Sequence, residues 1–144
     1  MNIKSLFVAS TLFASVYTSP VLAEPADGLN VLLTSADHQT QLMAMVLSMQ
    51  TIKAHNKDVN MLLCGPAGAL ALKETETPTL KPQNVSPTML LKKIMGMGAS
   101  VTVCPLYLPN ANKTATALME GITVANPAKI AGNLLNKDMQ NLSY

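Results

Sequence analysis

The feature that most constrains the fold is a regular alternation of short apolar runs with segments that carry helix signals. Apolar, β-branched runs are typical of buried strands, whereas a capping residue followed by apolar positions three or four apart is typical of helices. The predicted strands are 29–34, 59–63, 100–103, 122–125 and an edge strand 139–144, and the predicted helices are 38–55, 67–73, 87 to 96 or 98, 110–119 and 127–136. This order predicts a three-layer α/β/α sandwich with a mostly parallel sheet of about five strands.

The first helix has the strongest pattern of the chain. Asp37 or Ser35 can cap it, and its core stripe is expected to consist of Leu42, Met45, Val46, Met49 and Ile52. Met43 and Leu47 widen the apolar surface, so we expect this helix to be covered on more than one side.

Two connections are expected to lack regular structure. Residues 74–85 are rich in Thr, Pro, Glu and Lys and are predicted to form an exposed loop. Residues 105–109 form a second loop, which is unusually apolar because it contains Leu106, Tyr107 and Leu108. Together with the first helix, this loop predicts self-association.

The N-terminal residues have the pattern of a cleavable signal peptide. A basic start at residues 1–4 precedes a short apolar stretch, and Val21-Leu22-Ala23 offers small residues for cleavage. The apolar stretch is too short to span a membrane. We therefore expect residues 24–144 to form one mature domain, beginning at Glu24, that is periplasmic or secreted.

Composition argues against several classes of function. The formal net charge is only +2, the chain has no Arg, and its lysines are scattered, so nucleic acid is not an expected partner. The sequence contains no phosphate-binding loop, hydrolase motif or metal-ligand spacing, and no cofactor or metal site is predicted. The ten methionines allow a Cu(I)-binding interpretation, but their positions in predicted core elements favour packing.

Cys104 is the leading candidate for chemistry. It follows the strand 100–103, and Pro105 then stops the strand because proline has no N–H to donate. Ligands of open α/β sheets collect outside the carboxyl ends of the strands, so a thiol here is well placed to react. Free cysteine is also a common small core residue, and position alone leaves both interpretations open.

Cys64 and His38 are the other candidates. Cys64 also ends a predicted strand, so a disulfide with Cys104 is feasible if the two strands are neighbours and excluded if another strand lies between them. We expect reduced, unpaired thiols. His38 follows the first strand and is a weak candidate for a proton partner, the alternative being a solvated residue in the first helical turn.

The order of these elements resembles the DsrE/DsrF-like sulfur-relay family. The resemblance spans about residues 29–144, and its most specific segments are Gly98 to Cys104 and Gly121-Ile122-Thr123-Val124. It implies a three-layer α/β/α domain, assembly as a trimer or hexamer, and a persulfide on the cysteine that Cys104 matches. This chain would be an exported member.

Two classes of function follow. The first is a sulfur carrier that holds a persulfide on Cys104, with Cys64 as a second thiol and a protein of unknown identity as sulfur donor or acceptor. The second is a binding or assembly module with the same fold and no chemistry, and a soft-metal binder is a distant third. No hydrolase or oxidoreductase motif is present, so sulfur transfer is the only enzymatic activity under consideration.

Overall fold

The computed structural model describes residues 24–144, and the predicted signal peptide, residues 1–23, lies outside the described residues. Five parallel strands form one sheet in the order β4-β3-β2-β1-β5. Their bounds are β1 (Gly28–Leu33), β2 (Asp58–Leu63), β3 (Ser100–Val103), β4 (Thr123–Val124) and β5 (Met139–Ser143). All five predicted strands are therefore present, and the last one is an edge strand as expected.

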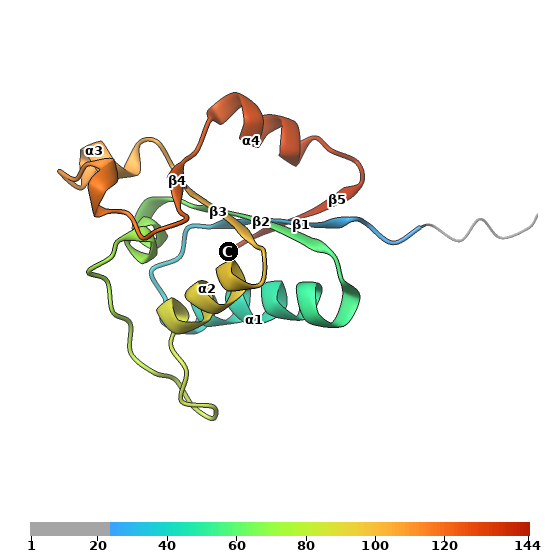
Figure 1. Ribbon diagram of the computed structural model, residues 1–144, viewed down its shortest axis with the longest axis horizontal. Coiled ribbons are helices and arrows are strands. Elements are labelled where there is room, and N and C mark those ends of the chain that lie inside the picture. Colours follow the sequence, from blue (N-terminus) through green and yellow to red (C-terminus); the bar gives the residue numbers. More distant parts are fainter. Residues whose placement is uncertain (1–23) are drawn as a thin grey trace, which may run out of the picture.

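Helices cover both faces of this sheet (Figure 1). Helices α1 (His38–His55) and α2 (Pro87–Gly96) pack side by side on one face, and α4 (Pro127–Leu134) covers the other. Three short helical segments, η1 (Gly65–Ala71), α3 (Tyr107–Asn110) and η2 (Ala115–Ala117), complete the chain. The predicted three-layer α/β/α architecture is confirmed.

Side-chain caps begin the three longer helices. The Asp37 carboxylate accepts a hydrogen bond from the Thr40 backbone N–H at 2.8 Å, which also lowers the pKa of Asp37. Ser86 accepts from the N–H of Met89, and Asn126 accepts from that of Lys129. Each cap satisfies a backbone donor that the first helical turn leaves free, which explains why these starts were predictable.

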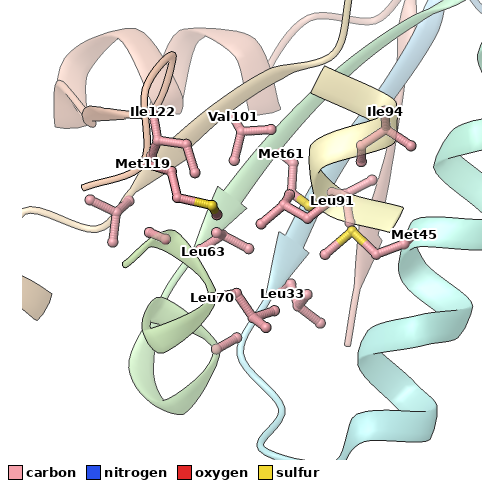
Figure 2. Close-up of a cluster of buried hydrophobic side chains, with 14 of the residues drawn as sticks. Leu33, Met45, Met61, Leu63, Leu70, Leu91, Ile94, Val101, Met119 and Ile122 are labelled. Atoms are coloured by element: carbon pink, nitrogen blue, oxygen red, sulfur yellow. The ribbon is translucent and has the colours of Figure 1, made fainter. Parts of the chain in front are cut away.

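The apolar core lies between the sheet and the α1–α2 layer. Figure 2 shows side chains from the strands meeting those of α1, α2 and η1, among them Leu33, Leu63 and Leu91, which are fully buried. Alternate strand residues point to the opposite face, where Asn30 and Asn60 replace apolar side chains. The apolar core therefore lies on one face of the sheet, and the layer between the other face and α4 is more polar.

The predicted stripe of α1 does pack against the core, but small and polar side chains share its most buried positions. The buried residues of this helix are Gln41, Ala44, Met45 and Ser48, whereas the remaining members of the predicted stripe are only partly buried. Small side chains at positions 44 and 48 allow the helix to approach the sheet closely. Met43 is 51% exposed and Leu47 is 40% exposed, so within one chain α1 is not covered on more than one side.

The segment after β3 also differs from prediction. The expected helix at 110–119 is absent: α3 ends at Asn110, Asn112 adopts a left-handed backbone with φ of 51°, and only the short 3₁₀ turn η2 follows. The expected loop 105–109 instead contains the start of α3, and Leu108 within it is buried. Of the three apolar residues that motivated self-association, only Leu106 is largely exposed.

Candidate functional site

The two cysteines lie side by side at the carboxyl edge of the sheet. β2 and β3 are neighbours, and their register pairs Leu63 with Val103, the residues that directly precede Cys64 and Cys104. The ladder continues for one more step, since the Cys104 N–H donates to the Leu63 carbonyl at 2.8 Å. Of the two strand orders left open by the sequence, the structure has the one that makes the thiols neighbours.

Both thiols are free and half-buried in this structure. Neighbouring strands lie about 4.8 Å apart, and residues at paired positions project to the same face. A separation of this size falls within the Cα range of about 4.4–6.8 Å found for disulfides. The pair can therefore exist as two thiols and can also be bridged without moving either strand.

The chain turns away from the sheet immediately after each cysteine. Gly65 follows Cys64 with φ of 52°, a left-handed conformation that favours glycine, and begins η1, with Pro66 in its first turn. After Cys104, Pro105 interrupts the ladder and the Tyr107 N–H donates to the Cys104 carbonyl at 2.9 Å. These two turns leave the thiols at the rim of the sheet.

A close contact joins the two segments that follow the cysteines. The ring of Tyr107 lies against Gly68 of η1, in space that a Cβ at position 68 would occupy. Gly68 is buried and Tyr107 is half-buried. The contact holds η1 against α3 and so fixes the two turns that carry the thiols.

The electrostatic environment distinguishes the two thiols. Burial raises the pKa of Cys64, and the neighbouring Cys104 thiol raises it further, from an ordinary 9.0 to about 12. Because the thiolate is the nucleophilic form of cysteine, Cys64 is held in its unreactive form at neutral pH. The direction of this shift disfavours Cys64 as a nucleophile and leaves Cys104, which follows β3, as the candidate for the attacking sulfur.

His38 is not part of this arrangement. It begins α1 after β1, and β1 lies on the opposite side of β2 from β3. Among residues 24–144, no side-chain hydrogen bond joins His38 to either cysteine. His38 instead lies next to Asp37, whose pKa is lowered mainly by the hydrogen bonds from Thr40 and to a smaller extent by the charge of His38.

A cavity under α4, with both polar and apolar lining residues, was not anticipated from the sequence. It encloses about 180 Å³ between the sheet and α4, and its lining includes Asn30, Asn60, Thr102 and Lys129. The Asn30 amide donates to the Asn133 carbonyl at 2.7 Å and accepts from Asn60 at 3.2 Å, so the buried amide is satisfied. Asn30 and Asn60, which interrupt otherwise apolar predicted strands, were the feature of the sequence that could have indicated this cavity.

The metal interpretation gains no support from residue placement. No group of three or more His, Cys, Asp or Glu side chains comes together among residues 24–144. Met45 and Met61 are buried in the apolar core, where they fill space between strands and helices.

Among residues 24–144, no helix is both long and apolar enough to cross a bilayer.

Sequence comparisons found neither a matching family model nor a match among curated proteins. Structural comparison did find relatives of the fold. The YchN protein from E. coli superposes with a TM-score of 0.64 at 13% identity, covering 81% of this chain and 99% of YchN. MTH1491 from Methanobacterium thermoautotrophicum, a protein of unknown function, superposes with a TM-score of 0.61 at 9% identity, covering 81% of this chain and 98% of its own. This chain therefore shares its α/β fold with these two proteins.

This result confirms the fold expected from the sequence resemblance. At these low identities the likeness concerns backbone architecture alone. An assignment of function to this chain must rest on its own residues, Cys64 and Cys104.

Proposed function

We propose that the protein is a sulfur carrier that holds a persulfide on Cys104 in an exported compartment. The observation that carries the proposal is the placement of two free, half-buried thiols at the carboxyl edge of a parallel sheet, where reactive groups of α/β folds gather. The resemblance to the DsrE/DsrF-like family supports it as an analogy of architecture. The signal-peptide pattern of residues 1–23 supports export.

The carrier cycle begins with attack by the Cys104 thiolate on a sulfane sulfur of a polysulfide or persulfide donor. The Cys104 Sγ forms a bond to that sulfur, the donor's S–S bond breaks, and the shortened donor leaves with the electron pair. Cys64 does not compete at neutral pH because its raised pKa keeps it protonated. The product is a persulfide on Cys104, ready for an acceptor thiol.

Sulfur uptake tests this proposal directly. Brief treatment of the reduced protein with sodium tetrasulfide should add ~32 Da, one sulfur atom, to the intact mass. Cys104→Ser should abolish the gain, whereas the matched Cys64→Ser variant should keep it. Absence of uptake in the Cys64→Ser protein, or equal uptake in Cys104→Ser, would contradict the assignment of the carrier to Cys104.

We also propose that the chain forms a homo-oligomer, a trimer or hexamer. The supporting observation is the uncovered apolar surface of α1, where Leu42, Met43, Val46 and Met49 border a hollow of about 790 Å³ against the loop at 80–85. Exposed apolar surface of this kind marks an association site. The same surface supports the second candidate function, an assembly module without chemistry.

Light scattering at micromolar concentration should give a trimeric or hexameric mass. Met43→Lys should shift the protein towards monomer, because a charge would replace an apolar contact in the α1 surface. Leu135→Lys is the matched control, since Leu135 is 85% exposed at the end of α4, away from that surface. A monomeric wild type would refute self-association.

A further inference from the structure

We propose that Cys64 discharges the persulfide on Cys104, releasing sulfide and leaving a Cys64–Cys104 disulfide. This inference rests on the proposed function and assigns a role to the second thiol. It makes the pair a site that reduces sulfane sulfur to sulfide, with polysulfides or low-molecular-weight persulfides as the substrate class.

The strand register supplies the geometry for this step. Cys64 and Cys104 each follow one member of the Leu63–Val103 pair, and the bond from the Cys104 N–H to the Leu63 carbonyl keeps the strands in register at this point. A disulfide across these positions therefore needs side-chain rotation but no backbone movement. The chain has only two cysteines, so no third thiol competes for the persulfide within one chain.

The position of attack follows from the same neighbour relation. The Sγ atoms of paired residues on adjacent strands can reach bonding distance, as in a disulfide, whereas the terminal sulfur of the persulfide extends beyond the Cys104 Sγ. Cys64 is thus placed to attack the inner sulfur. Attack on the outer sulfur would instead move the persulfide to Cys64.

The step is balanced in atoms and electrons. Cys64 loses its proton and attacks the Cys104 Sγ, so a bond forms between the two Sγ atoms and the bond from Sγ to the terminal sulfur breaks. The terminal sulfur leaves with the electron pair and, with the proton, becomes hydrosulfide. The two cysteine sulfurs are oxidised together by two electrons, and the sulfane sulfur is reduced to sulfide. A dithiol reductant then restores both thiols by thiol–disulfide exchange.

The environment of Cys64 fits a thiol that acts second. Its raised pKa disfavours direct reaction with a donor in solution, but an intramolecular partner is held beside it at high effective concentration. Both cysteines are half-buried, so a small donor can reach Cys104. Cys104 therefore reacts with the donor first, and Cys64 reacts with the resulting persulfide second.

The test compares the lifetime of the persulfide in wild type and Cys64→Ser. Each protein is loaded with sodium tetrasulfide, freed of excess reagent, and followed by intact mass and by release of sulfide. Wild type should lose the added ~32 Da and a further ~2 Da as the disulfide forms, releasing about one sulfide per chain. Cys64→Ser and Cys64→Ala should retain the persulfide about tenfold longer or more.

Three results would overturn the inference. Equal lifetimes in wild type and Cys64→Ser would show that Cys64 takes no part in discharge. A persulfide found on Cys64, without a disulfide, would show attack on the outer sulfur. Failure of both proteins to take up sulfur would contradict the proposed carrier function itself. This outcome differs from the first two because no ~32 Da adduct is seen at any time.

Discussion

At pH 7.5, iodoacetamide is expected to label Cys104 at least about tenfold faster than Cys64 in the folded protein. The reason is the raised pKa of Cys64, about 12, which leaves very little thiolate at that position at neutral pH. As the pH rises from 8 to 11 the labelling rate of Cys64 should increase about tenfold per pH unit, because the whole range lies below its pKa. Initial rates measured by peptide mass spectrometry give both values.

The Cys104→Ser variant is the control for the cause of this shift. Burial is the largest single cause of the raised pKa of Cys64 and does not depend on the Cys104 thiol, so Cys64 should stay slow in this variant. Unfolding in guanidinium chloride should remove the protection and bring the two rates together in wild type. Faster labelling of Cys64 than of Cys104 in the folded protein would contradict the proposed division of roles.

Leu63→Ala is expected to lower the free energy of unfolding by about 2–5 kcal/mol. The Leu63 side chain is fully buried beneath the thiol pair, between the sheet and η1 (Figure 2). Truncation removes apolar contacts and leaves a cavity in a rigid part of the core. Urea unfolding monitored by circular dichroism measures the change.

Leu106→Ala is the matched control for that variant. Leu106 is 70% exposed on the segment between Cys104 and α3, so its truncation should change the free energy of unfolding by no more than about 0.5 kcal/mol. A loss of less than about 1 kcal/mol in Leu63→Ala would show that the core beneath the thiols is more loosely packed than described.

The sequence was sufficient to predict the elements that have local signals. Strand β3 and helix α1 have the predicted bounds, because a β-branched run and a capped apolar segment determine their structure with little help from the rest of the chain. The helix expected at 110–119 does not form; Asn112 adopts a left-handed backbone, and Leu118 and Met119 are buried outside any helix. The apolar stripe of α1 was predictable, but the burial of Ala44 and Ser48 beside it was not.

The pairing of the thiols depended on strand order, which no local signal contains. Each cysteine was predictable as the residue after a strand, but their contact arises only because β2 lies next to β3. The same order separates His38 from Cys104, so the histidine that sequence position suggested is two strands away. The raised pKa of Cys64 could not be predicted from the sequence either, because the burial that causes it depends on the tertiary structure.

Locating the sulfane sulfur on the wild-type protein tests the central claim most directly. Cleavage after lysine separates the two cysteines, since Cys64 falls in peptide 58–73 and Cys104 in peptide 94–113. After brief polysulfide loading and trapping with iodoacetamide, the additional ~32 Da is predicted on peptide 94–113. Sulfur found first on peptide 58–73, or on neither peptide, would contradict Cys104 as the carrier.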